Sequence, residues 1–154
     1  MVSRQTILAI DYGTRRLGLA ISEPATEIAL PFPALVRRNT GWDLAQLEAL
    51  VAEREVTKIV VGLPIHMNGS PSSESEGARD LAQRLETSTG IEVEMLDERW
   101  TTVEAERILR ASEPGKRRRQ RSRKSGELDS AAATILLRTY LDRSRMQSTM
   151  GNPS

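Results

Sequence analysis

The apolar residues near the start of the chain fall into three short runs, each of a length typical of a strand. These runs cover 7–10, 17–21 and 30–36. Gly13 and Gly18 bracket a polar turn between the first two runs, which predicts a β-hairpin. The third run contains two prolines, which suit an edge strand because a missing amide donor costs least there. The chain is therefore expected to begin with three antiparallel strands.

Beyond these runs, stretches with helical spacing of apolar residues alternate with two further strand-length runs. The predicted strands are 58–64 and 91–96, and the predicted helices are 43–55, 73–89, 101–110 and 128–143. The expected N-terminal signals of the first three helices are Asp43 as an N-cap, and capping boxes of Ser73 with Glu76 and of Thr101 with Glu104. This order predicts an α/β fold in which a mixed five-stranded sheet, three antiparallel strands and then parallel strands, is flanked by helices.

Length and composition narrow the class of protein. At 154 residues the chain has the size of one domain, which we expect to cover 1–143, with a disordered tail over 144–154. The absence of cysteine excludes disulfides, thiolate metal sites and cysteine nucleophiles. No apolar run is as long as a membrane span, and the first residues do not resemble a signal peptide. We therefore expect a soluble, cytoplasmic protein with no membrane partner.

One segment of the chain is strongly basic. The formal net charge is +1, but the stretch 116–124 carries seven basic residues and no acidic one, which leaves −6 for the rest of the chain. Pro114-Gly115 and Gly126 frame this stretch, so we expect a loop. A solvated loop would be its ordinary interpretation. The purity of its charge favours docking of a phosphate backbone, for which the candidates are Lys116, Arg117, Arg118, Arg119, Arg121, Arg123 and Lys124.

Three acidic residues stand where strands end or helices begin. Asp11 ends the first strand, Glu98 follows the strand 91–96, and Asp129 lies in the first turn of the last helix, on the stripe of its apolar residues. Each has an ordinary alternative, an Asx-turn for Asp11 and a favourable contact with a helix N-terminus for the other two. Three carboxylates at one sheet edge would repel one another unless cations lay between them. Hard divalent cations take such oxygen ligands, and two of them about 3.5 to 4 Å apart support in-line phosphoryl displacement.

Four short motifs follow one another along the chain. They are Asp11-Tyr12-Gly13-Thr14-Arg15-Arg16-Leu17-Gly18, Gly62-Leu63-Pro64 with Met67-Asn68-Gly69-Ser70, Asp97-Glu98-Arg99-Trp100-Thr101-Thr102, and Lys124 to Asp129 followed by Ala131-Ala132. With these motifs, nearly the whole chain from Thr6 to Leu141 resembles the YqgF/RuvX family. Its members are bacterial RNase H-like proteins, regarded as Holliday-junction-resolvase-like nucleases and as nucleases that complete the 5′ end of 16S ribosomal RNA. The resemblance implies an RNase H-like fold.

The resemblance also implies roles for individual residues. Asp11, Glu98 and Asp129 would be the catalytic acids and would hold two Mg²⁺ or Mn²⁺ ions, with Asp11 bridging them. Four further residues would contact substrate or approach its phosphates: Thr14, Arg15, Arg99 and Lys124. The chain departs from the family at His66, where Asn is usual, and in the serine-rich loop that follows Ser70.

Two further residues near the expected site have open roles. His66 is the only histidine, and we favour a plain loop residue over a general base because metal ions can generate the hydroxide without one. Trp100 follows Glu98 closely and could stack on a base or begin a packed helix. Aromatic residues are few, so recognition is expected to depend on backbone and shape more than on sequence.

These expectations favour a metal-dependent nuclease that processes the 5′ end of pre-16S ribosomal RNA, with ribosomal particles as a further partner. The alternatives are a Holliday junction resolvase acting on branched DNA and a non-catalytic RNA-binding factor of ribosome assembly or transcription. Intact acids favour the enzyme, because a pure binder gains nothing from negative charge gathered against phosphate. A sugar kinase or actin-like ATPase is excluded by length, since that architecture needs two such domains. Both a monomer and a homodimer remain open, and a dimer would favour the DNA substrate.

Overall fold

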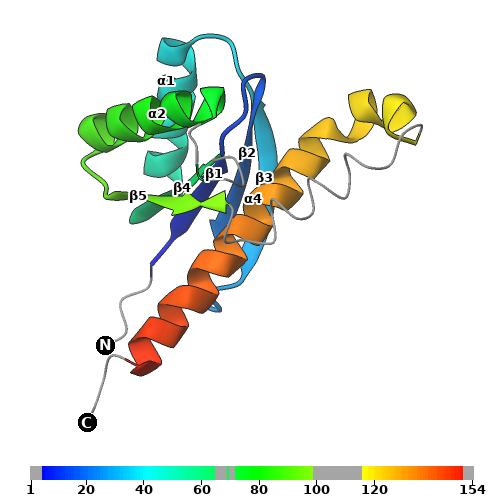
Figure 1. Ribbon diagram of the computed structural model, residues 1–154. Helices are drawn as coiled ribbons and strands as arrows, with labels where there is room; N and C mark the ends of the chain where they lie inside the picture. The colour runs from blue at the N-terminus through cyan, green and yellow to red at the C-terminus, as the bar shows by residue number, and fades with distance from the viewer. Residues whose placement is uncertain (1–4, 65–68, 70–71, 99–115, 151–154) are drawn as a thin grey trace.

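A computed structural model shows a five-stranded mixed sheet with helices on both faces (Figure 1). It describes residues 5–64, 69, 72–98 and 116–150, with side chains for all of these except 73, 116–129 and 148–150. The strands are β1 (Ile7–Asp11), β2 (Arg16–Ser22), β3 (Ala29–Val36), β4 (Lys58–Leu63) and β5 (Val93–Asp97). Their order across the sheet is β3-β2-β1-β4-β5, which places the proline-containing strand at an edge as predicted.

The register of the strands brings distant parts of the chain to one edge of the sheet. β1 pairs antiparallel with β2, and β2 antiparallel with β3, which confirms the hairpin and the antiparallel start. β4 pairs parallel with both β1 and β5, so the carboxyl ends of these three strands lie together. In this register Asp11 lies beside Gly62, and Gly62 lies beside Leu96. The expected mixed sheet is confirmed.

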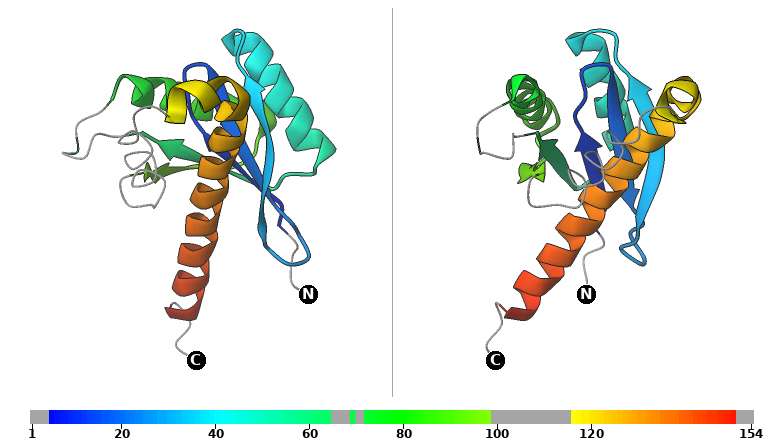
Figure 2. Two further views of the ribbon diagram at one scale, coloured as in Figure 1. Left: turned by 90° about the vertical axis from the view of Figure 1, so that its right-hand side faces the viewer. Right: turned by 45° about the vertical axis from the view of Figure 1, so that its right-hand side comes forward.

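The hydrophobic core has two layers, one on each face of the sheet. Helices α1 (Thr40–Glu53) and α2 (Ser73–Thr89) cover one face of the sheet, and α4 (Lys116–Met150) crosses the other (Figures 1 and 2). Apolar residues of α1 and α2 such as Leu47 and Leu81 pack on one side, and Leu136 and Leu137 of α4 pack on the other. Along the described residues, no helix combines the length and the apolar character that a membrane crossing requires.

Several small residues lie on the face under α4. Ala9 and Ala20 of the sheet and Ala132 and Ala133 of the helix are all buried, so the helix backbone can approach the strands closely. Leu136 is fully buried one turn further along α4. The apolar stripe predicted for the last helix is therefore confirmed.

The predicted helix caps are wrong at both helices where the structure can test them. The N-cap of α1 is Asn39, whose side-chain oxygen accepts a hydrogen bond from the Trp42 amide at 2.8 Å. Asp43 lies inside the helix and is fully buried, because Arg37 neutralises its charge. The N-cap of α2 is Ser72, whose hydroxyl donates to the Pro64 carbonyl instead of capping the helix. The predicted helix over 101–110 lies outside the described residues.

The basic stretch is helical where the sequence predicts a loop. Helix α4 begins at Lys116 and includes the whole stretch, and it also passes through Gly126. Arg, Lys and Gln are good helix formers, so one glycine does not outweigh their preference. The helix continues to Met150, where the sequence predicts a disordered tail from 144 onward. Figure 2 shows that its two ends project past the strands.

Candidate active site at the carboxyl edge of the sheet

Asp11 is the last residue of β1, and its side chain is directed to the α4 face. Ile7 and Ala9 of the same strand pack in the cluster under α4, and alternation along the strand puts Asp11 on that side. The chain turns directly after it, where a Cβ on Gly13 would collide with the Arg16 carbonyl oxygen. The Asp11 side chain is only 3% exposed. A charged group in such a place needs compensation from its surroundings.

Glu98 follows β5 and is also completely buried. Its carboxylate lies over Gly62 of β4: a Cβ built on Gly62 would be 2.5 Å from Glu98 Oε1 and 3.3 Å from Cδ. The same Cβ would lie 3.1 Å from Cδ2 of Leu136 on α4. The missing side chain of Gly62 therefore makes the room in which the Glu98 carboxylate lies, between the sheet and α4.

The two carboxylates gather at one point of the sheet edge. Asp11 is the register partner of Gly62, and the carboxylate of Glu98 lies over that same glycine. Adjacent strands are about 4.8 Å apart, so the two acids occupy neighbouring positions on the α4 face. Two like charges in a buried place favour a bound cation, and a hard divalent cation takes carboxylate oxygens as ligands. The donor set fits Mg²⁺ or Mn²⁺.

The third predicted acid, Asp129, lies in α4, but its side chain is outside the described part. The next residue, Ser130, is buried and donates a hydrogen bond of 2.6 Å from its hydroxyl to the Phe32 carbonyl of β3. This bond fixes the adjoining turn of α4 against the sheet. Among the side chains that the structure describes, no three acids, histidines or cysteines come together as a metal site. Asp11 and Glu98 are the two predicted ligands that it places side by side.

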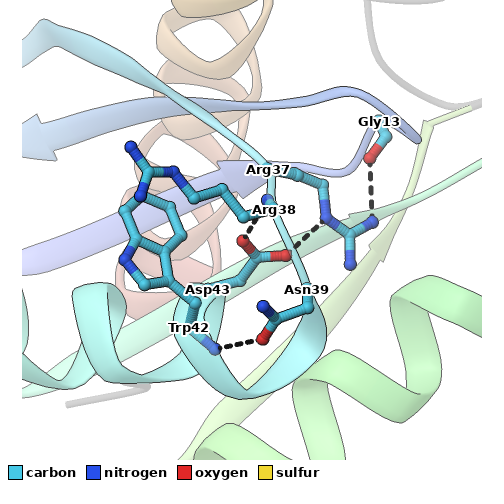
Figure 3. A network of polar contacts seen from close by, with 6 residues as sticks. All are labelled: Gly13, Arg37, Arg38, Asn39, Trp42 and Asp43. Atoms are coloured by element: carbon cyan, nitrogen blue, oxygen red, sulfur yellow. Dashed lines mark hydrogen bonds and ion pairs between the residues drawn. The ribbon is translucent and has the colours of Figure 1, made fainter.

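The turn after Asp11 is held by a polar network that the sequence does not reveal (Figure 3). Arg37, directly after β3, donates from Nε to Asp43 Oδ2 at 2.9 Å and from Nη1 to the Gly13 carbonyl at 3.1 Å. Asp43 Oδ1 accepts a second hydrogen bond, from the Arg38 amide at 3.0 Å. The signal in the sequence would have been an acid, Asp43, on the apolar stripe of its helix.

Thr14 and Arg15, predicted to contact substrate, are exposed in this turn. Thr14 also lines a shallow pocket of about 290 Å³ together with Tyr12, Arg37, Arg38, Asn39, Thr40 and Asp43. The other predicted contacts are not placed. His66, Arg99 and Trp100 lie outside the described residues, as do the side chains of the basic stretch 116–124. The described part of the site is therefore Asp11, Glu98 and the turn beside them.

Comparison with known proteins matches almost the whole chain. A family model described as "RuvX: Holliday junction resolvase" matches residues 5–143. A protein of Koribacter versatilis (strain Ellin345) named "Putative pre-16S rRNA nuclease" is 42% identical over 137 residues, which cover 89% of this chain and 86% of the relative. A protein of the same name from Moorella thermoacetica (strain ATCC 39073 / JCM 9320) is 40% identical over 137 residues, 89% of this chain and 94% of the relative.

Solved structures resemble the fold at much lower sequence identity. RuvC of Thermus thermophilus superimposes with a TM-score of 0.55 at 15% identity, covering 91% of this chain and 96% of RuvC. Its complex with a Holliday junction substrate gives a TM-score of 0.56 at 14% identity, with the same coverage. This likeness and the strand order confirm the expected RNase H-like fold.

Proposed function

The chain belongs to the RuvX family, and from this premise we propose that it is a nuclease that hydrolyses phosphodiester bonds, with the 5′ end of pre-16S ribosomal RNA as its substrate. The observation that carries the proposal is the pair of buried carboxylates, Asp11 and Glu98, gathered beside Gly62. The names of relatives that are 37–42% identical support the RNA substrate.

The proposed catalytic residues are Asp11, Glu98 and Asp129, and we propose that they hold two Mg²⁺ or Mn²⁺ ions. Such ions, when bound, lower the pKa of a coordinated water and stabilise charge on the reacting phosphate. Asp11 is fixed by its strand, and Glu98 by the space over Gly62 and by Leu136 behind it. The two carboxylates are thus oriented before metal ions or substrate bind, and the apolar side chains packed on the core side exclude water there.

The proposed substrate contacts come from two parts of the chain. Thr14 and Arg15 are exposed in the β1–β2 turn, where they can meet the phosphates of one strand. Arg99 follows Glu98 in the chain, and the basic stretch from Lys116 to Lys124 precedes Asp129 on α4. A helix rich in basic residues can bind a phosphate backbone without reading sequence. Recognition of shape is therefore expected to dominate.

Branched DNA is the second candidate substrate, because the matching family model is described as a Holliday junction resolvase. A non-catalytic binding factor is disfavoured by the two buried acids. Acids beside a phosphate backbone weaken binding unless cations compensate them.

The experiment compares cleavage of an end-labelled precursor 16S RNA fragment and of a four-way DNA junction, each with Mg²⁺, Mn²⁺ or EDTA. Wild type is compared with Asp11→Asn and with Asp80→Asn, an exposed acid of α2 that pairs with Arg84 in its own helix. We expect RNA cleavage by wild type and Asp80→Asn that EDTA and Asp11→Asn both abolish. Cleavage of the junction alone would move the proposal to DNA. Binding without cleavage of either substrate would overturn it in favour of a binding factor.

A further inference from the structure

Arg37 makes several contacts with the turn that follows Asp11. Its backbone amide donates to the Arg15 carbonyl at 2.9 Å, and its Nη1 donates to the Gly13 carbonyl at 3.1 Å. Its guanidinium carbon also lies 4.9 Å from the centre of the Tyr12 ring. Arg37 therefore contacts Tyr12, Gly13 and Arg15, most of the turn that follows Asp11. Figure 3 shows its hydrogen bond to the Gly13 carbonyl.

Buried Asp43 fixes the guanidinium from the other side. Its Oδ2 lies 2.9 Å from Arg37 Nε, and its side chain is 1% exposed against 16% for Arg37. Burial by itself would lower the pKa of Arg37, but hydrogen bonds and charge interactions with Asp43 and Tyr12 raise it above its ordinary value. Removing one partner of such a pair would leave an uncompensated charge inside the protein. The pair therefore connects the residue after β3 to α1.

The Tyr12 ring is confined from the other side as well. A Cβ on Gly77 of α2 would collide with the Tyr12 hydroxyl oxygen, so the ring packs directly on the helix backbone. The residue after Asp11 is thus enclosed by Arg37 and by α2. Because a single peptide joins Tyr12 to Asp11, these contacts bear on the end of β1.

We propose that Arg37 is a positioning residue for Asp11, holding the turn 12–15 through Asp43 so that the Asp11 carboxylate keeps the orientation required for cleavage. The inference rests on the proposed nuclease function. Arg37 needs two directional donors at once, Nε toward Asp43 and Nη1 toward Gly13. Lysine carries its charge on one nitrogen and cannot make this fork. The role of Arg37 is therefore geometric and is distinct from a phosphate contact.

The test compares Arg37→Lys and Asp43→Asn with the matched control Arg38→Met. Arg38 is the next residue and is exposed, and its side chain lies over the Trp42 ring at 4.5 Å. The measurements are kcat and KM for the substrate that wild type cleaves, amide hydrogen exchange of residues 12–15, and urea unfolding to set the folded fraction. Both network variants keep a side chain of similar size.

We expect Arg37→Lys and Asp43→Asn each to lower kcat about 10- to 100-fold, the loss typical of a catalytic group displaced by about 1 Å. KM should stay within about threefold of wild type, and amide exchange over 12–15 should accelerate. Arg38→Met should leave all three unchanged. If Arg37 were instead a phosphate contact, Arg37→Lys would change KM, and Asp43→Asn would not share a loss in kcat.

Three results would overturn the inference. They are unchanged kcat in both network variants, an effect confined to KM, and equal losses in Arg38→Met. A fall in stability alone, with kcat per folded molecule unchanged, would count against it in the same way. Failure of wild type to cleave any substrate would instead refute the proposed function, so the two failures are distinguishable.

Discussion

The carboxylate of Glu98 lies in the space left by the missing side chain of Gly62. A Cβ on that glycine would be 2.5 Å from Glu98 Oε1, closer than nonbonded atoms can lie. Asp11 is the register neighbour of Gly62 on β1. One glycine in the middle of an apolar strand thus makes room for one acid beside another.

Substitution of Gly62 by alanine should displace Glu98 with little harm to the fold. The added methyl group must move either the carboxylate or Leu136, whose Cδ2 would be 3.1 Å away. We expect kcat to fall about 10- to 100-fold, and overpacking to lower the free energy of unfolding by about 1 to 3 kcal/mol. Cleavage kinetics and urea unfolding measure the two effects.

Gly41→Ala is the matched control, since a Cβ there would meet Asn39 Oδ1 at an ordinary 3.5 Å. It lies in the first turn of α1, and we expect it to keep wild-type kcat. Equal activity of Gly62→Ala and Gly41→Ala would show that the position of Glu98 does not matter for cleavage.

Ser130→Ala should loosen the turn of α4 that carries Asp129. The substitution removes the 2.6 Å hydrogen bond from the Ser130 hydroxyl to the Phe32 carbonyl, a bond between α4 and β3. We expect a loss of about 1 kcal/mol in unfolding free energy and a fall in kcat of about 10-fold. Thr139→Ala is the control, because its hydroxyl bonds the Ile135 carbonyl within α4. If Thr139→Ala loses as much activity as Ser130→Ala, the bond to β3 has no special role.

The basic stretch should determine how binding depends on salt. Replacing Arg117, Arg119 and Arg121 with glutamine should reduce the slope of log affinity against log salt by about 0.7 to 0.9 for each phosphate that the variant no longer neutralises. The control replaces Arg54, Arg79 and Arg84, which are exposed on α2 and at the end of α1, away from the α4 face. A fluorescence binding titration at four salt concentrations measures both. Equal slopes for the two triple variants would contradict a docking role for the stretch.

Lys58 should contribute to stability in a pH-dependent way. Its hydrogen bond to Tyr140 outweighs its burial and, with the bond to Glu94 at 3.1 Å, raises the lysine pKa above its ordinary 10.5. A raised folded-state pKa stabilises the protein below the unfolded pKa, and this contribution is lost as pH rises through the folded value. Lys58→Met should therefore be less stable than wild type at pH 8, and the difference should shrink above about pH 10.5. Urea unfolding at pH 8 and above about pH 10.5 measures the difference in unfolding free energy between the two proteins. A difference that does not change with pH would show that Lys58 contributes through packing alone.

Hydrophobic pattern alone predicts the sheet, because each strand is a separate apolar run and short connections limit how the runs can pair. The position of Asp11 at a strand end follows from the same pattern, and the edge position of β3 follows from its two prolines. The N-cap of α1 does not follow from this pattern, because both Asn39 and Asp43 are good N-cap residues. Only the tertiary ion pair with Arg37 allows Asp43 to be buried.

The contacts that build the site depend on residues far apart in the chain. The space over Gly62 is visible only once β4, the residue after β5 and α4 are assembled. The helical state of the basic stretch escapes prediction for another reason: the flanking proline and glycines favour a loop, but the residues between them are strong helix formers. The local signal for the approach of the Glu98 carboxylate to β4 is a glycine, Gly62, inside an apolar strand.

Single-turnover cleavage of a precursor 16S RNA fragment tests directly whether Asp11 and Glu98 form one catalytic site. The rate is compared for wild type, Asp11→Asn, Glu98→Gln and the double variant. Residues that act as one catalytic unit are strongly non-additive. We therefore predict that each single variant loses at least about 1,000-fold and that the double variant loses no more than the worse single one. Single variants that retain wild-type rates, or losses that multiply in the double variant, would contradict a joint catalytic site at Asp11 and Glu98.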